Sequence, residues 1–326
     1  MKAFLTGGTG FIGGHVARVL RGRGDHVVAL ARAPSRATGL SDLGCEVVAG
    51  DVATMTSLPG EAVGCDTVIH VAGVYRVGVP ASERPGMYAT NVTGTERVLD
   101  AAAQSSVPRV VYVSTVNVFG NTRGRVVDET YVRPPGPFLS WYDETKFRAH
   151  EAALQRSRDG LPIVIAMPGG TYGPGDHSEV GKVVDQTRTG KLKMRMFPEL
   201  GFNLGHVEDV ASGIVRCADR GRAGESYVLG GQIARMGELV DIVARLSGRR
   251  PPRVTMPVWA MRAATPAGPL VGRLMGYPPN LGEMIDAAAG VTYWATDRRA
   301  RDELGYAPRG LEEGLRQTLA ATGPAA

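Results

Sequence analysis

The sequence predicts an α/β fold, a doubly wound parallel sheet followed by a smaller, irregular C-terminal lobe. Short apolar runs rich in β-branched residues alternate with helical stretches through the first half of the chain. A glycine-rich segment, Gly7–Gly13, lies between the first apolar run and the first helical stretch. After Pro168 the alternation stops, and glycine and proline become frequent. These observations place the sheet in the first half of the chain and the lobe in the second.

The predicted strands of the first half are apolar on both faces, which is typical of parallel strands covered by helices. They are Lys2–Thr6, Asp25–Ala31, Glu46–Ala49, Thr67–Val71, Arg109–Ser114 and Pro162–Met167. The predicted helices carry apolar residues on one stripe, at intervals of three and four. They are Gly13–Arg23, Met87–Ser105 and Trp141–Arg158.

The second half predicts fewer regular elements. Helices are expected over Val180–Thr189, Val207–Asp219 and Met236–Leu246, and a strand over Ser226–Leu229. The segment Pro251–Pro279 is apolar and rich in proline. We therefore expect residues 1–167 to form a dinucleotide-binding Rossmann domain to which residues 203–223 return, and residues 168–326 to form mainly a substrate-binding lobe.

Composition excludes several classes of protein. The chain has 326 residues, of which 43% are hydrophobic and 21% charged, so it is neither disordered nor fibrous. No apolar run approaches the roughly 18 residues of a membrane span, and the N-terminus does not resemble a signal peptide. Three scattered cysteines predict reduced thiols and a cytoplasmic location. A net charge of +5 from dispersed basic residues, without a nucleic-acid motif, favours a small-molecule substrate over nucleic acid or membrane. The histidines show no metal-ligand spacing, so we expect no metal site.

The glycine segment has the spacing of a dinucleotide site. Small residues let the backbone turn tightly beside a pyrophosphate, and the following helix offers free N–H groups to the anion. The segment follows a strand and opens a helix, which is the context that supports this interpretation. The expected cofactor contacts are Gly7, Thr9, Gly10, Phe11, Ile12 and Gly13.

The end of the second strand indicates which nicotinamide cofactor is bound. NAD-binding sites usually carry a carboxylate there for the ribose hydroxyls, but this chain has Ala31 followed by Arg32, with Arg36 close behind. An arginine can bind a ribose phosphate with two hydrogen bonds. We therefore expect Arg32 and Arg36 to favour NADP(H), with NAD(H) as the alternative. Asp51 and Val52, after the third strand, are expected at the adenine.

A tyrosine and a lysine share one face of a predicted helix, because Tyr142 and Lys146 are four residues apart. A tyrosine hydroxyl is a weak acid with a pKa near 10. A nearby ammonium lowers that pKa, so Tyr142 is predicted to exchange a proton with a substrate oxygen. Thr115 follows the fifth strand, where a hydroxyl can hold the same oxygen.

The chain resembles the extended short-chain dehydrogenase/reductase family, also called the NAD-dependent epimerase/dehydratase family. The segments that carry this resemblance are TGGTGFIG at Thr6–Gly13, HVAG at His70–Gly73, NVTGT at Asn91–Thr95, VSTVNVFG at Val113–Gly120, YDETK at Tyr142–Lys146, MPGGTYGPGD at Met167–Asp176, HVEDVA at His206–Ala211 and DELGYAP at Asp302–Pro308.

The resemblance implies roles for individual residues. Thr115, Tyr142 and Lys146 would form the catalytic triad, with Lys146 also binding the nicotinamide ribose. Asn91 would bond backbone on the helix beside the site and support a proton-relay water. The remaining expected cofactor contacts are Val71, Ala72 and Gly73 on the adenosine side and Pro168 facing the nicotinamide. Family members commonly pair through helices equivalent to Met87–Ser105 and Trp141–Arg158, so we expect a homodimer.

Departures from the family pattern narrow the function. Dehydratases carry Asp-Glu after the triad threonine, where this chain has Val116 and Asn117. The stretch Leu30–Arg36 resembles the dihydroflavonol-reductase-like branch, whose members reduce ketones and aldehydes with NADPH, although later segments also resemble bacterial hopanoid-associated sugar epimerases. We expect an NADP(H)-dependent oxidoreductase that interconverts a carbonyl and an alcohol on a small organic substrate. A nucleotide-sugar epimerase with tightly bound NAD is the alternative, and a redox-sensing module without catalysis is disfavoured by the complete triad.

Two adjacent carboxylates, Asp128 and Glu129, resemble a catalytic pair. Neighbouring residues face apart, so we expect them to be loop residues instead.

Overall fold

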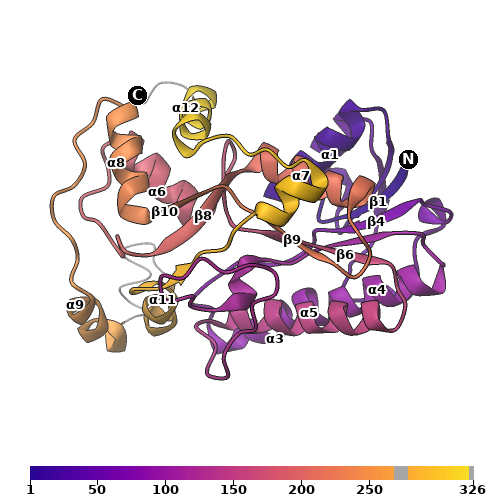
Figure 1. Ribbon diagram of the computed structural model, residues 1–326, viewed down its shortest axis with the longest axis horizontal. Helices are drawn as coiled ribbons and strands as arrows, with labels where there is room; N and C mark the ends of the chain where they lie inside the picture. The colour runs from indigo at the N-terminus through magenta and orange to yellow at the C-terminus, as the bar shows by residue number, and fades with distance from the viewer. Residues whose placement is uncertain (268–277, 323–326) are drawn as a thin grey trace.

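A seven-stranded parallel sheet forms the centre of the structure, a computed structural model that describes residues 1–267 and 278–322. The strand order is β3-β2-β1-β4-β5-β6-β9 (Figure 1). The strands are β1 Lys2–Thr6, β2 His26–Ala31, β3 Glu46–Ala49, β4 Thr67–His70, β5 Val110–Val113, β6 Ile163–Pro168 and β9 Ser226–Leu229. The order reverses between β1 and β4, and ligands of doubly wound sheets bind at such a switch point. The doubly wound parallel sheet that we predicted is confirmed.

Helices cover both faces of this sheet, with α1 and α7 on one face and α4 and α5 on the other (Figure 1). Their bounds are α1 Phe11–Gly22, α4 Gly94–Gln104, α5 Trp141–Arg158 and α7 Val207–Arg220, and the short α2 spans Thr38–Asp42. The face under α1 and α7 buries Leu5, Leu20 and Ile214. The opposite face buries Leu99 and Ile165. The strands are thus apolar on both sides, as their sequences predicted.

The predicted helix Met87–Ser105 differs from the structure. Helical backbone begins three residues earlier, in α3 Arg84–Tyr88, where Pro85 occupies the first turn. It continues through a π-helical segment, Ala89–Thr93, into α4. Hydrophobic periodicity did not detect the π segment, because one wider turn hardly changes the apolar pattern. Asn91 lies inside this segment.

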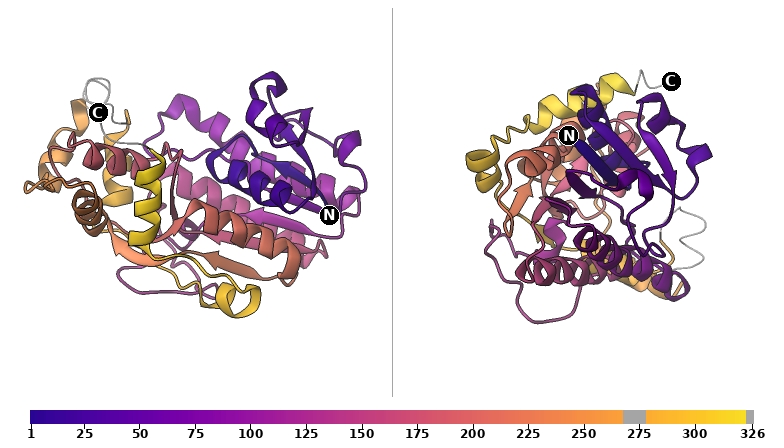
Figure 2. Two further views of the ribbon diagram at one scale, coloured as in Figure 1. Left: turned by 90° about the horizontal axis from the view of Figure 1, so that it is seen from above. Right: turned by 90° about the vertical axis from the view of Figure 1, so that its right-hand side faces the viewer.

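A second sheet organises the small lobe, by which we mean this sheet and the helices packed around it. Strand β8 Gly201–His206 pairs with β7 Gly170–Tyr172, β10 Gln232–Arg235 and β11 Thr292–Tyr293. The helices are α6 Glu179–Arg188, α8 Met236–Leu246, α9 Val258–Ala263, α11 Leu281–Ala288 and α12 Leu311–Ala321. The lobe has its own core, which includes Leu204, Leu239 and Leu315. It lies at the end of the molecule away from the N-terminus (Figures 1 and 2).

The sequence did not predict these four strands, since β7, β10 and β11 have two to four residues each and β8 contains two glycines. The two sheets also interleave along the chain. Residues 203–206 belong to the small sheet, α7 packs against α1, and β9 adds the edge strand of the large sheet. Of the predicted proline-rich segment Pro251–Pro279, residues 268–277 lie outside the described residues.

One carboxylate ties the small lobe to the N-terminal half. Glu283 on α11 is buried and accepts hydrogen bonds from the backbone N–H groups of Gly78 at 3.2 Å and Trp141 at 3.0 Å. Its second oxygen accepts from Arg84 at 2.9 Å and Asn280 at 3.1 Å. Trp141 is the first residue of α5, so a negative charge lies at the positive end of that helix.

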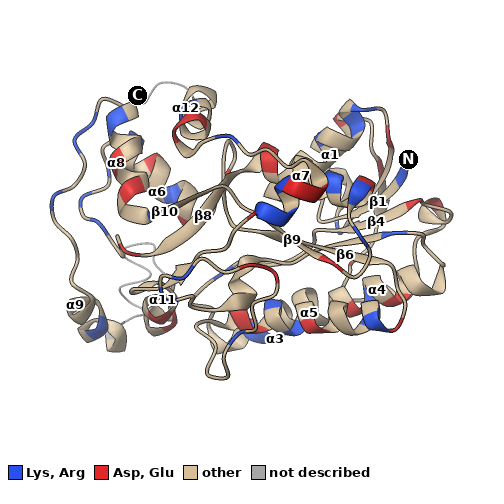
Figure 3. Cartoon of the chain, viewed as in Figure 1, with Lys and Arg blue, Asp and Glu red and all other residues tan. Residues whose placement is uncertain are grey.

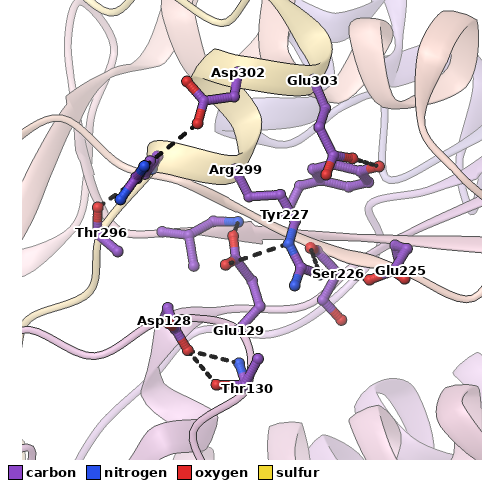
Figure 4. Close-up of polar contacts among 12 residues, drawn as sticks. Asp128, Glu129, Thr130, Glu225, Ser226, Tyr227, Thr296, Arg299, Asp302 and Glu303 are labelled. Atoms are coloured by element: carbon purple, nitrogen blue, oxygen red, sulfur yellow. Dashed lines mark hydrogen bonds and ion pairs between the residues drawn. The ribbon is translucent and has the colours of Figure 1, made fainter.

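The open edge of β9 is covered by the loop that carries the two adjacent carboxylates (Figure 4). Glu129 accepts from the backbone N–H of Val228 at 2.8 Å and lies 3.9 Å from Arg299. Asp128 points away and accepts from the backbone and hydroxyl of Thr130. A strand edge with free N–H groups needs such a cover. The two carboxylates therefore face apart, as expected, and stabilise the fold.

Charged residues of both signs alternate along the helices, for example on α4, α5 and α12 (Figure 3). No helix among residues 1–267 and 278–322 is both long enough and apolar enough to cross a membrane. Within the same ranges, no group of three or more His, Cys, Asp or Glu side chains is arranged to hold a metal ion.

Candidate active site

One cavity of about 670 Å³ runs along the carboxyl ends of the large sheet's strands and reaches the small lobe. Its size is within the range of small-molecule sites. Nearly every predicted site residue lines it: Gly7, Thr9, Gly10, Phe11, Ile12, Gly13, Arg32, Asp51, Val52, Val71, Ala72, Gly73, Thr115, Tyr142, Lys146 and Pro168. Arg36 and Asn91 are not among the lining residues.

The glycine segment forms the floor of one end of the cavity. Gly7 has a φ of +74°, and a Cβ there would lie 2.5 Å from the backbone nitrogen of Ala72. A Cβ on Gly13 would lie 2.1 Å from the Gly7 carbonyl oxygen. Glycine is therefore required at both positions by contacts between backbone segments.

The N-terminus of α1 is open to a ligand. Gly10 is its N-cap residue and supplies no side chain to the first-turn N–H groups, and the first turn has no acidic residue. Unpaired N–H groups with the positive end of a helix attract phosphate. The residues present therefore fit a dinucleotide pyrophosphate.

The adenosine end carries one exposed cation. Arg32 follows β2 and lines the cavity beside Ala31. Arg36 lies in the 3₁₀ turn Pro34–Arg36, is exposed, and does not reach the cavity. The expectation that Arg36 contacts cofactor stays a prediction, because Arg36 is exposed and is not among the residues that line the cavity. Asp51 accepts from the N–H of Ala53 at 2.9 Å and still lines the cavity.

The lysine and tyrosine are buried side by side on the first turns of α5. Lys146 donates to the carbonyl oxygen of Val113 at 2.9 Å and to the hydroxyl of Tyr112 at 3.3 Å. Burial lowers the pKa of Lys146 to about 8, so the ammonium remains mostly charged at neutral pH. Thr115 caps the 3₁₀ turn Val116–Phe119 at the end of β5.

The structure corrects our expectation for the tyrosine. Burial raises the pKa of Tyr142 above its usual value, and the nearby Tyr75 and Asp143 act in the same direction. The hydrogen bond with Thr115 is the contribution that lowers it. Desolvation by burial is the largest cause of this rise, and the ammonium of Lys146 is bonded to Val113 and Tyr112. The ring of Tyr75 packs edge-on against Tyr142, with ring centroids 4.8 Å apart.

Asn91 holds the loop after β4 instead of the helix backbone that we expected. Its side chain accepts from the N–H of Val74 at 2.7 Å and donates to the Val74 carbonyl at 3.0 Å. It also donates to the hydroxyl of Thr145 on α5 at 3.0 Å. Asn91 thus joins the π segment, the loop and the tyrosine-bearing helix, because the wider turn points it inward.

Several lining residues were not predicted as site residues. They come from the loop after β4, the π segment, the turn after β5 and the chain from β7 onward: Tyr75, Thr90, Asn117, Thr171, Asp176, His177, Val180 and Phe202. The sequence offered one signal for Asn117, since it stands at the second of the two positions where the sequence analysis expects Asp-Glu in dehydratases. Thr171 and Asp176 lie in the segment Met167–Asp176 that carries the family resemblance, but neither has a role assigned by it, and His177, Val180 and Phe202 lie outside the quoted segments.

Known proteins identify the family of this chain. The sequence pattern of the NAD dependent epimerase/dehydratase family matches residues 3–230. The chain belongs to this family. It is accordingly an enzyme of the extended short-chain dehydrogenase/reductase type, whose members use a nicotinamide cofactor.

Relatives within this family differ in what they act on. The chain is 32% identical over 268 residues to a Synechocystis sp. protein named as a candidate dihydroflavonol 4-reductase, covering 78% of this chain and 75% of the relative. It is 29% identical to the 4-hydroxy-2-methyl-3-oxo-4-farnesyl-3,4-dihydroquinoline-1-oxide ketoreductase of Stigmatella aurantiaca, covering 100% of this chain and 97% of the relative. Among solved structures, MoeE5 in complex with UDP-glucose and NAD is 26% identical with a TM-score of 0.78, covering 99% of this chain and 98% of that one.

Two histidines, His70 and His150, are buried against the large sheet. His70 contacts the hydroxyls of Thr6 at 2.7 Å and Thr95 at 3.0 Å, and His150 contacts Ser114 at 2.9 Å. Burial and the nearby Lys146 charge lower the pKa of His70 to about 3 and of His150 to about 4. Both histidines are therefore neutral in the folded protein at pH 7 and bind protons more readily when unfolded.

Acid should destabilise the protein through these histidines. A lowered folded-state pKa leaves stability intact above the unfolded pKa of about 6.5 and removes it as the pH falls toward 4, by about 1.4 kcal/mol per pH unit for each histidine. In His150→Asn the amide can take over the hydrogen bond of Nδ1 with Ser114 but does not titrate. We expect the free energy of unfolding of this variant to fall less steeply with falling pH, by the contribution of one histidine. Urea unfolding of both proteins at pH 7, 6, 5 and 4 measures it, and parallel slopes would show that His150 does not contribute.

Proposed function

We propose that the protein is an NADP(H)-dependent oxidoreductase that interconverts a carbonyl and an alcohol on a small organic substrate. One observation carries the proposal: Thr115, Tyr142 and Lys146 line the same cavity as the glycine segment and Arg32. A cofactor held by the glycine segment at one end can therefore reach the three side chains at the other.

Each side chain of the triad has a distinct task. Tyr142 gives a proton to a carbonyl oxygen or takes one from an alcohol. Thr115 would hold the same oxygen by donating its hydroxyl proton, and Lys146 would bind the ribose of the cofactor when it is present. When bound, the nicotinamide supplies or accepts the hydride.

The substrate end of the cavity favours an uncharged molecule. Among the described residues, Arg32 and Lys146 are the lysine and arginine side chains that line the cavity, and Arg32 lies at the adenosine end. A nucleotide-sugar substrate brings a diphosphate, which needs cationic partners. Tyr75, Val180 and Phe202 instead provide aromatic and aliphatic contacts, and the neighbouring Asp176 and His177 add a carboxyl group and an imidazole rather than a lysine or arginine. This supports a reductase over the nucleotide-sugar epimerase, which remains the second candidate because MoeE5 binds UDP-glucose and NAD.

Cofactor exchange distinguishes the two candidates. The purified protein is denatured and any released nucleotide identified, and NADPH absorbance is then followed with a panel of ketones and aldehydes of increasing size. Loss of absorbance with a ketone supports the reductase. Retained NAD, with conversion of a UDP-sugar and no net change in absorbance, would replace it with the epimerase.

Cofactor preference should depend on Arg32. A charge-assisted hydrogen bond contributes roughly 1.5–3 kcal/mol, so we expect Arg32→Ala to raise the Kd for NADPH at least about tenfold and the Kd for NADH little. Arg36→Ala is the matched control, because Arg36 is exposed outside the cavity and should leave both constants unchanged. Fluorescence titration measures the Kd of both cofactors for the wild type and for each of the two variants. Equal affinity of the wild type for NADH and NADPH would contradict the proposal.

We also propose that the protein forms a homodimer through α4 and α5, which lie side by side on one face of the sheet. A two-fold axis would bury the same helix pair of each copy against the other. Light scattering at micromolar concentration should give twice the monomer mass of 34.5 kDa. A monomeric mass would refute the dimer.

A further inference from the structure

Two segments of the small lobe lie side by side at the end of the molecule away from the N-terminus (Figure 1). One connects α6 to β8, and the other connects α8 to α9. The N–H of Arg195 in the first segment donates to the Val254 carbonyl in the second at 2.9 Å. The N–H of Met256 donates back to the Arg195 carbonyl at 2.9 Å. Backbone hydrogen bonds thus hold the two segments together.

Five exposed basic side chains lie on these two segments, and Figure 3 shows the blue of lysine and arginine on both. We call them the basic strip: Lys191, Lys193, Arg249, Arg250 and Arg253. Within the described part of the chain, none of the five forms an ion pair or a side-chain hydrogen bond. The last carboxylates before the two segments, Asp185 and Asp241, are already paired with Arg188 and Arg195. The positive charge of the basic strip is therefore uncompensated.

Exposed apolar side chains continue the basic strip toward α9. Val254 is 58% exposed, Val258 38% and Trp259 75%. Apolar side chains on a protein surface are usually scattered singly, but these three lie on one stretch, 254–259, directly after Arg253. An indole has an apolar ring and a polar N–H, which suits it to the boundary between lipid and water. Long basic side chains suit the same boundary, because their stems are apolar and their heads are charged.

Helix α6 connects the basic strip to the cavity. Ser178 and Val180 at its beginning line the cavity, and Lys191 follows its end. A helix of this length, 10 residues, spans about 15 Å. The substrate end of the cavity therefore lies about one helix length from the basic strip, and a molecule dissolved in a bilayer at the strip would have a short path to Tyr75 and Phe202.

We propose that this end of the small lobe docks on a membrane surface that contains anionic lipids, with the basic strip against the headgroups and Trp259 inserted between them. Charge complementarity favours this occupant, because anionic headgroups attract uncompensated lysine and arginine. The aliphatic Val254 and Val258 favour lipid over nucleic acid, because they gain from burial among acyl chains, whereas nucleic acid offers mainly phosphate.

We thereby revise our expectation that the protein has no membrane partner. Composition shows basic residues dispersed along the sequence, and it cannot show that two distant segments bring five of them together. Docking on a surface needs no membrane-spanning helix. It also goes beyond the proposed oxidoreductase function and does not depend on it, because binding to lipid needs no turnover.

Vesicle sedimentation tests the docking. The full chain is mixed with vesicles of phosphatidylcholine alone, or of phosphatidylcholine with phosphatidylserine. We expect binding to the mixed vesicles only, weakened by added salt. Combined Arg249→Gln, Arg250→Gln and Arg253→Gln should raise the lipid concentration for half-maximal binding about 100-fold, from the usual contribution of three cations near an anionic surface.

The insertion of Trp259 is measured by fluorescence. Mixed vesicles should shift the emission of the wild type to shorter wavelength, because an exposed indole leaves water. In Trp259→Ala this shift should disappear, and binding should weaken about tenfold through the lost apolar burial. An unchanged shift in Trp259→Ala would contradict the insertion.

A matched control separates the place of the charge from its amount. Combined Arg18→Gln, Arg36→Gln and Arg158→Gln removes the same charge from exposed arginines outside the small lobe, so it should bind the mixed vesicles nearly as the wild type does. Circular dichroism checks that each variant is folded. Equal losses in the control and in the strip variant would overturn the docking site, and so would a wild type that leaves mixed vesicles unbound. Retention of DNA without vesicle binding would replace the lipid surface with nucleic acid.

Discussion

Tyr142→Phe is expected to lower kcat by about 100- to 10,000-fold, which is the usual contribution of a proton-transfer group. The substitution removes only the hydroxyl, and the ring can keep its edge-on contact with Tyr75. The pKa of Tyr142 lies above its usual value near 10, so the phenol is protonated at neutral pH and carries the proton that a carbonyl oxygen would receive. The affinity for NADPH should change little.

The measurement is steady-state reduction of a ketone with NADPH, together with fluorescence titration of the cofactor. Tyr75→Phe serves as a control, since it removes a hydroxyl from the neighbouring ring without removing the proposed proton donor. More than half of the wild-type rate in Tyr142→Phe would exclude Tyr142 from the mechanism.

Gly13→Ala is expected to weaken NADPH binding by about 100-fold. The new Cβ would lie 2.1 Å from the Gly7 carbonyl oxygen, so the glycine segment must move. That carbonyl also accepts from the N–H of Gly10 at 2.9 Å, which means that the turn over the helix N-terminus shifts with it. Losing two charge-assisted hydrogen bonds to phosphate costs at least about 3 kcal/mol, which corresponds to about 100-fold in affinity.

The adjacent glycine offers a matched control. A Cβ on Gly14 would lie 3.4 Å from the Gly8 carbonyl, an ordinary contact, so Gly14→Ala should bind NADPH nearly as the wild type does. Fluorescence titration compares the two variants, and circular dichroism confirms that each is folded. Equal affinities in the two variants would show that the segment does not hold the phosphates as proposed.

The sheet could be predicted from the sequence because its strands are buried on both faces. Runs such as Ile163–Pro168 are uniformly apolar, and amphipathic helices separate them. This combination is typical of a parallel sheet whose two faces are covered by helices. The small sheet could not be predicted in this way. Its central strand, β8, has two glycines and an asparagine, and its partners β7, β10 and β11 have two to four residues each.

The candidate site likewise contains residues that the sequence could indicate and residues that it could not. The glycine segment and the pair Tyr142 and Lys146 have local spacings that follow from helix and turn geometry, so the sequence could indicate them. The contact of Asn117 with the carboxylate of Asp143 could not be recognised, because the two residues are 26 positions apart. Nor could the sequence show that Arg32 lines the cavity while Arg36 does not, since both are arginines close to the end of the same strand.

Glu283 restricts how the small lobe can be exchanged between relatives to change substrate specificity. Its four hydrogen bonds join α11 to the loop at Gly78, to Arg84 and to the first N–H of the tyrosine-bearing helix. A chimaera that receives a foreign small lobe without this carboxylate would leave the N–H groups of Gly78 and Trp141 without their acceptor. The lobe can therefore be exchanged between relatives only where the incoming lobe carries a carboxylate at the position of Glu283. Recombination experiments should choose crossover points that keep this carboxylate together with Arg84.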